Sequence, residues 1–173
     1  AVSVTGATDV CGSLVVTGDG ALDLGAHAVA VADSVRVEQR GTFRMQNDAA
    51  VLRVAGDVYI GGANTTGLLT AGRLEIGGDL RVQRGSSGCC NTFPRSLDAS
   101  GTHLVVLNGS GPQSVTFSHA ALTGDDMRLN NLRIDNASAI TFGRAAVRGT
   151  LDVAAPGAIG GAGPVLIGSE LRT

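Results

Sequence analysis

The sequence predicts an all-β fold, a right-handed parallel β-solenoid (β-helix) with about 22 residues and three short strands per turn. Three observations support it. Short segments of one form recur every 21 to 23 residues, apolar residues alternate within them, and glycine with Asp, Asn or Ser separates them. Recurrence at a fixed interval is typical of solenoids, and alternation indicates strands with one buried face. Dividing 173 residues by 22 predicts seven to eight turns, a rod of roughly 35 Å at ~4.8 Å per turn.

The first set of recurring segments defines one side of the solenoid. Its members begin 21, 23 and 22 residues apart and are Ser13–Val16, Ser34–Val37, Asp57–Ile60 and Asp79–Val82. Within each segment the second and fourth residues are apolar, so these positions face the core. Their recurrence in one register indicates four successive turns.

Two further sets complete each turn. The second consists of Ala28–Val31, Val51–Val54 and Arg73–Ile76, and the third of Ala21–Leu24 and Thr42–Met45. Glycine and Asp between the segments favour sharp corners, because glycine tolerates positive φ and Asp bonds to nearby backbone. A narrow aliphatic interior fits the aromatic content of only 3%.

The repeat is interrupted once and then resumes. Residues 84–101 are rich in Gly, Ser and Cys without alternation, which predicts an irregular loop from one corner. Strands are predicted again at His103–Leu107, Gln113–Phe117, Asn131–Ile134, Ala139–Phe142 and Thr150–Val153. Ala155–Gly168 is predicted to be a loose final turn, and residues 1–173 to form a single solenoid domain.

Composition excludes several classes of protein. With 43% hydrophobic residues and a net charge of -2, the chain is expected to fold rather than remain disordered. The longest aliphatic run, Leu104–Leu107, is far too short for a membrane-spanning helix. No basic patch or aromatic platform predicts nucleic-acid binding, and no motif predicts a cofactor.

The three cysteines, Cys11, Cys89 and Cys90, cannot all pair within one molecule. Cys11 falls in the first turn and the other two in the loop after the fourth, so a bridge within one chain would have to cross several strand spacings. An intermolecular disulfide is one hypothesis. The alternative is a buried Cys11 with an adjacent disulfide or a free pair at Cys89 and Cys90.

An outward-facing row offers the candidate binding surface. The outward residues of the first set are Val15, Arg36, Tyr59 and Arg81, and the row is predicted to continue with Arg133 and Asp152. Neighbouring side chains lie about one strand spacing apart, so Tyr59 can stack with the guanidinium planes of both arginines. This row is either a solvated face or a stripe that binds a sugar ring.

Metal and catalytic sites are weakly indicated. Asp57 and Asp79 occupy equivalent corners and are weak candidates for holding calcium, but Gly-Asp is also a common corner sequence. The three histidines fall in different turns, without the spacing of a zinc site or a catalytic triad. We therefore expect neither a metal, a cofactor nor enzymatic activity.

One passage is similar to a known group of proteins. Ser100-Gly101-Thr102-His103-Leu104-Val105-Val106-Leu107-Asn108-Gly109-Ser110-Gly111-Pro112-Gln113-Ser114-Val115-Thr116-Phe117, followed by Asn130–Ile134, resembles the β-solenoid repeats of large bacterial surface and secreted, adhesin-like proteins. The resemblance extends over roughly Val10 to Val153. It implies an extracellular rod used for display, adhesion or assembly, and no catalytic residues.

The ends of the chain suggest how such a rod would function. No amphipathic helix covers the terminal apolar segments, Val2–Val4 and Val165–Ile167, and a chain starting at Ala1 suits a processed secreted protein or a fragment. We expect a non-enzymatic extracellular structural protein that stacks end to end into a surface fibre. The alternative is a carbohydrate-binding or polysaccharide-cleaving β-helix, or an adhesin module of a larger surface protein. The expected partners are further copies, neighbouring modules of the same protein, or glycans.

Overall fold

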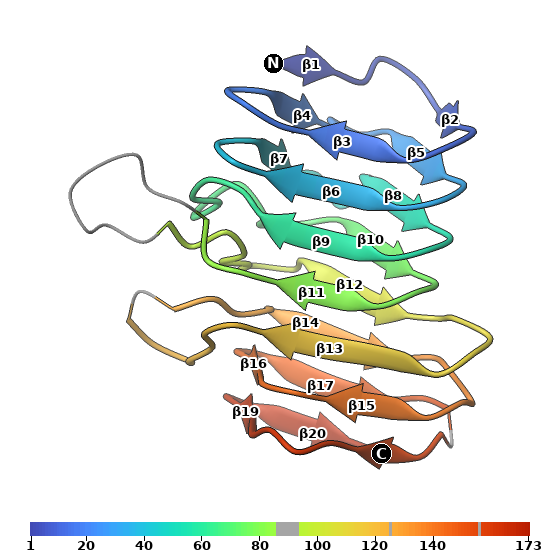
Figure 1. The fold of residues 1–173 in the computed structure, drawn as a ribbon, viewed down its shortest axis with the longest axis vertical. Helices are drawn as coiled ribbons and strands as arrows, with labels where there is room; N and C mark the ends of the chain where they lie inside the picture. The colour runs from blue at the N-terminus through green and yellow to red at the C-terminus, as the bar shows by residue number, and fades with distance from the viewer. Residues whose placement is uncertain (86–93, 125, 156) are drawn as a thin grey trace.

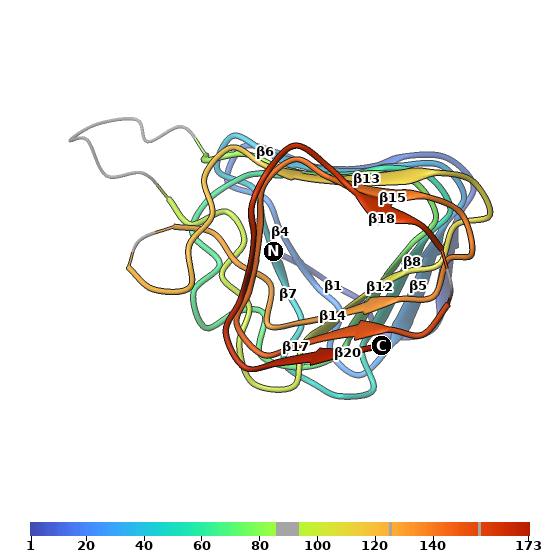
Figure 2. The same ribbon diagram turned by 90° about the horizontal axis from the view of Figure 1, so that it is seen from below.

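The computed structural model describes residues 1–85, 94–124, 126–155 and 157–173. In this part of the chain there are strands and turns but no helix, and so none long and apolar enough to cross a membrane. Successive turns stack with every strand pair parallel, which confirms the predicted β-solenoid (Figure 1). Seen from the C-terminal end the chain turns counterclockwise as it approaches the viewer (Figure 2), so the coil is right-handed.

One side of the solenoid is an eight-stranded sheet. Its strands, in spatial order, are β2 (Thr8–Val10), β5 (Ala28–Val31), β8 (Val51–Val54), β10 (Arg73–Ile76), β12 (Leu104–Leu107), β14 (Asn131–Ile134), β17 (Thr150–Val153) and β20 (Glu170–Arg172). Each strand is one turn beyond its neighbour, so the sheet spans seven complete turns, within the predicted range.

A second side is a seven-stranded sheet that runs the length of the rod. It contains β3 (Leu14–Val16), β6 (Val35–Glu38), β9 (Val58–Gly61), β11 (Leu80–Val82), β13 (Gln113–Phe117), β15 (Ile140–Phe142) and β18 (Ile159–Gly160). Inward and outward residues alternate along it: Val35 and Val37 are buried, whereas Arg36 between them is exposed.

The third side is regular only near the two ends of the rod. One end has β1 (Val2–Ser3), β4 (Ala21–Asp23) and β7 (Thr42–Arg44), and the other has β16 (Ala145–Val147) and β19 (Val165–Ile167). Among the described middle residues, single bridges such as Met45 to Leu69 and Asp98 to Arg128 replace strands. The middle turns carry longer connections on this side, so three strands per turn hold at the ends and two in the middle.

The core is a column of stacked aliphatic side chains. Along the eight-stranded sheet, Val29, Leu52, Leu74, Val105 and Leu132 pair in sequence, and each is at most 2% exposed. The predicted large residues Phe43 and Met45 are buried, as is Phe142. This interior is what close packing of equivalent residues in a narrow bore requires.

Backbone approaches backbone at the corners, and glycine makes this possible. A Cβ placed on Gly62 would lie 2.1 Å from the carbonyl oxygen of Gly41, one turn away. Ala63 N donates to that same oxygen at 2.9 Å. A larger residue at Gly62 would therefore push neighbouring turns apart.

Several short strands were not predicted. β1, β2 and β16 have only two or three residues, too few to show alternation, and β18 and β19 lie in the segment expected to be a loose turn. Their pairing with a neighbouring turn determines their conformation. In the predicted loop 84–101, the described residues form no strand, although Asp98 makes a bridge.

Candidate functional site

The predicted surface of Arg36, Tyr59 and Arg81 is brought together on the seven-stranded sheet. The three residues pair directly on adjacent strands. The Arg36 guanidinium carbon lies 4.8 Å from the centre of the Tyr59 ring, and the Tyr59 hydroxyl donates to Gln83 at 3.2 Å. A depression of about 110 Å³ lies there. A sugar stacking on that face of Tyr59 would have to displace Arg36.

The predicted extension of this row to Arg133 and Asp152 is wrong. Arg81 pairs with Thr116 on β13, whereas Arg133 and Asp152 pair with one another on the eight-stranded sheet. The long connection between β11 and β12 shifted the repeat, so the first strand after it belongs to the other side.

The corner carboxylates Asp57 and Asp79 bind backbone amides. Asp57 Oδ1 accepts the Asp79 N–H at 2.8 Å, and Asp79 Oδ1 accepts the Ser114 N–H at 2.6 Å. Each carboxylate thus joins one turn to the next, which is the ordinary role of Asp at a corner. Across the described ranges, no group of three His, Cys, Asp or Glu residues has the arrangement of a metal site.

Of the three cysteines, only Cys11 lies within the described residues. It is exposed and free, and it follows β2 at the corner that leads to β3 (Figure 1). Cys89 and Cys90 fall in the undescribed range 86–93. The segment that contains them leaves the solenoid after β11, at the opposite corner (Figure 1).

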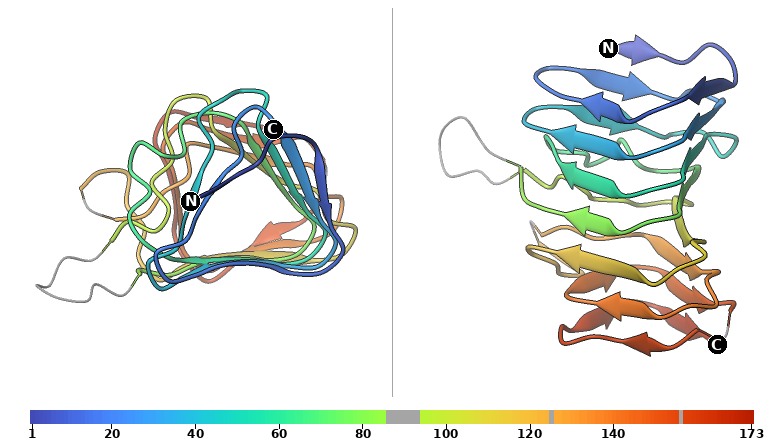
Figure 3. Two further views of the ribbon diagram at one scale, coloured as in Figure 1. Left: turned by 90° about the horizontal axis from the view of Figure 1, so that it is seen from above. Right: turned by 45° about the vertical axis from the view of Figure 1, so that its right-hand side comes forward.

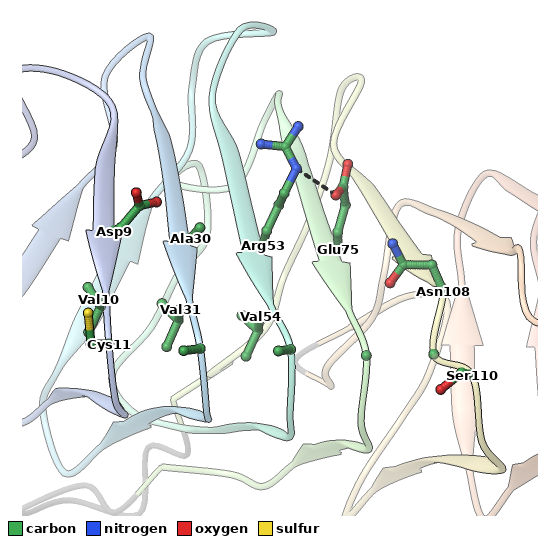
Figure 4. Close-up of a pocket in the computed structure, with 14 residues that line it drawn as sticks. Asp9, Val10, Cys11, Ala30, Val31, Arg53, Val54, Glu75, Asn108 and Ser110 are labelled. Carbon is green, nitrogen blue, oxygen red and sulfur yellow. Dashed lines mark hydrogen bonds and ion pairs between the residues drawn. The ribbon is translucent and has the colours of Figure 1, made fainter.

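A shallow groove that sequence reasoning missed crosses the first strands of the eight-stranded sheet (Figure 4). It has a volume of about 620 Å³. Its lining includes small residues at Ala30, Ala32 and Ala55. Beside them Arg53 Nε donates to Glu75 at 3.0 Å. Small outward residues gave no signal in the sequence, because they resemble any solvated strand face.

Buried amides hold the corner that closes one end of this groove. Gln113, 3% exposed, donates to the Ile76 carbonyl at 2.9 Å, and its Oε1 accepts the Gly109 N–H at 3.0 Å. Asn136, 1% exposed, donates to that Oε1 at 2.7 Å and to the Gly111 carbonyl at 2.9 Å. The 108–112 corner is therefore fixed by side chains inside the bore.

A buried ion cluster lies on the third side. Asp98 Oδ1 accepts from Arg128 Nε at 2.8 Å and Arg148 Nη2 at 3.0 Å. Its Oδ2 accepts from Arg95 Nη1 at 3.0 Å and Thr66 Oγ1 at 2.8 Å. Burial alone would raise the pKa of Asp98, but these donors outweigh burial and hold the pKa below its usual value. The cluster ties together turns that lack a regular third strand.

His103 is buried without a hydrogen-bond partner for either ring nitrogen. Burial lowers its pKa from 6.5 to about 4, because the charged form would lose its hydration. The imidazole is therefore neutral at pH 7 and packs as a core residue. Neither a metal nor a second titratable group was expected beside it from the sequence.

The two ends of the rod are the remaining candidate site. Six terminal strands each have one unpaired edge (Figure 3): β1, β2 and β3 at one end, and β18, β19 and β20 at the other. Core columns end there in exposed side chains, with Val2 67% and Leu171 56% exposed. In residues 1–173, these edges and side chains face solvent.

The comparisons with known proteins do not identify a family. No family model matches the chain, no curated protein matches it significantly, and no solved structure does so either. A function for this chain must therefore be inferred from its fold and from the geometry of the described residues.

Proposed function

We propose that this chain is a structural rod, an extracellular β-solenoid subunit that assembles end to end into a surface fibre. The observation that carries the proposal is the pair of open ends. Each has three unpaired strand edges and an exposed apolar core position. Unpaired edges readily add further strands, and a contact between opposite ends repeats without closing.

The lateral surfaces support a structural role. On the candidate row, the face of Tyr59 under Arg36 is occupied, and the Asp57 and Asp79 carboxylates bind backbone. Glu75, the carboxylate in the groove, is held by Arg53 at 3.0 Å and Arg73 at 2.7 Å. Groups that stabilise neighbouring turns in this way suit a rod better than a catalytic centre.

An extracellular, bacterial surface location is proposed from the sequence. The resemblance of Ser100–Phe117 to repeats of secreted and surface proteins supports it. The exposed free thiol of Cys11 is available for a disulfide with another molecule, which oxidising compartments permit.

Electron microscopy of the purified chain at several concentrations, with and without reductant, tests the proposal. We expect filaments whose length increases with concentration. Loss of filaments on reduction would assign a cysteine of one copy to the joint. Isolated short rods under every condition would contradict end-to-end assembly and indicate a module of a longer surface protein.

A carbohydrate-binding role is the second candidate, and the groove in Figure 4 favours it. The groove is lined by Arg53, Asn108 and Ser110, which offer hydrogen-bonding groups to hydroxyls. This role predicts a monomer whose melting temperature rises with an added glycan, since a ligand that binds only the folded state stabilises it. A filament without any such shift would exclude it.

A further inference from the structure

We propose that the partner at each end is a second copy of this chain, docked in one register that sets Asp9 of one copy directly beside Arg172 of the next. In this joint, β2 of one copy continues the eight-stranded sheet beyond β20 of its neighbour. The inference rests on the proposed function and adds to it the partner, the polarity and the paired residues.

The register follows from the sheet itself. Its eight strands pair without a slip, so one outward column runs from the first strand to the last. The column consists of Asp9, Ala30, Arg53, Glu75, Val106, Arg133, Asp152 and Arg172. Continuing the sheet by one more strand in this register places the next copy's Asp9 after Arg172.

Charges along the column favour this register. Directly adjacent charged residues have opposite signs throughout: Arg53 binds Glu75 at 3.0 Å, and Arg133 lies 3.7 Å from Asp152. An Arg172 to Asp9 pair continues that pattern. A slip of one residue would instead turn every core side chain of the added strand to the outside.

The apolar ends favour contact between opposite ends rather than like ends. In head-to-tail stacking, the core column that contains Leu171 continues into the next copy, and the exposed Val2 column at the other end is covered. Two first turns meeting about a two-fold axis would bring Asp9 of each copy together, and like charges opposite each other are unfavourable. The head-to-tail contact is heterologous and propagates.

A designed disulfide tests the register. The variant carries Asp9→Cys and Arg172→Cys in a background with Cys11→Ser, Cys89→Ser and Cys90→Ser. Residues paired across parallel strands lie about 4.8 Å apart, within the Cα separation that a disulfide spans. We expect mild oxidation to convert assembled protein into a ladder of covalent oligomers on a denaturing gel.

The matched control replaces Arg172→Cys by Glu170→Cys in the same background. Glu170 faces the same side but lies two residues away along β20, too far from the next copy's Asp9 position to bridge. This control should assemble without forming the ladder. A ladder from the control but not from the test variant would overturn the register.

The outcomes separate this inference from the proposed function. Filaments by microscopy without a ladder from the test variant would overturn the register and leave end-to-end assembly intact. Absence of both filaments and ladder would overturn both.

Charge reversal gives a second test with unmodified cysteines. Asp9→Arg or Arg172→Asp alone should raise the critical concentration for assembly about fivefold, since like charges then face each other. The double variant should restore it toward the original value. Equal effects of the double and the sum of the singles would contradict the pair. Melting of the dispersed subunit should stay unchanged, because both residues are exposed.

Discussion

At the scale of single residues, the consequential positions are polar side chains inside the bore. His103, Asp98, Gln113 and Asn136 are all nearly inaccessible to solvent. Three of them satisfy their polar atoms with neighbouring turns, and His103 does not. Their substitution therefore tests how the bore accommodates charge and hydrogen bonding.

His103 should make the fold sensitive to acid. Its pKa is about 4 in the folded chain and 6.5 when unfolded, so the unfolded state binds more protons between these values. Stability is fully present above pH 6.5 and falls as the pH decreases through 4, by up to about 3 kcal/mol. Urea unfolding at pH 7.5 and 4.5 should show a smaller loss for His103→Leu than for the parent chain. His119→Leu, at an exposed position, is the control; an equal reduction there would contradict the assignment.

Asp98 should be among the most sensitive polar positions. Asp98→Asn removes the charge that compensates Arg128, whose side chain is 5% exposed. Removing one partner of a buried ion pair typically costs about 3–5 kcal/mol. Chemical denaturation measures the loss. Asp19→Asn, which removes an exposed pair with Arg40, is the control and should have little effect. Equal losses in the two variants would contradict a special role for Asp98.

At the scale of strands and corners, repetition made most of the fold predictable. Alternating segments such as Ser34–Val37 identified the strands, because a buried face imposes its period on the sequence. Strands of two or three residues, such as β1 and β18, leave no such period and depend on a paired neighbour. The long connection after β11 shifted the repeat, which explains why Arg133 was placed on the wrong side.

The candidate site was predictable only where it follows the repeat. Arg36, Tyr59 and Arg81 came together because they occupy equivalent strand positions. The Asp98 cluster joins residues 30 and 50 positions apart through an irregular side, which no periodicity reports. The same holds for Gln113 and Asn136, whose inward direction depends on their neighbours in three dimensions.

Glycine at one corner tests how closely the turns approach. Gly62→Ala would place a Cβ 2.1 Å from the Gly41 carbonyl oxygen, and overpacking of this kind typically costs about 1–3 kcal/mol. Gly111→Ala is the control, because no atom lies within 4 Å of its added Cβ. Thermal unfolding should show a clear loss for the first and almost none for the second. Similar melting temperatures for both variants would contradict tight stacking at this corner.

At the scale of the whole molecule, the rod has two unlike ends and no repeat of its own beyond them. Eight strands along one sheet at ~4.8 Å each give about 38 Å per copy. Opposite ends that join head to tail make every copy equivalent, so the axial repeat of a fibre equals the length of one copy. Like ends that join in pairs double it.

The axial repeat of the assembled chain, measured by cryo-electron microscopy of its filaments, tests end-to-end stacking most directly. Head-to-tail stacking predicts polar filaments with a repeat of about 38 Å and a strand spacing of ~4.8 Å along the axis. A repeat of about 76 Å without polarity, or rods that never associate at any concentration, would contradict it.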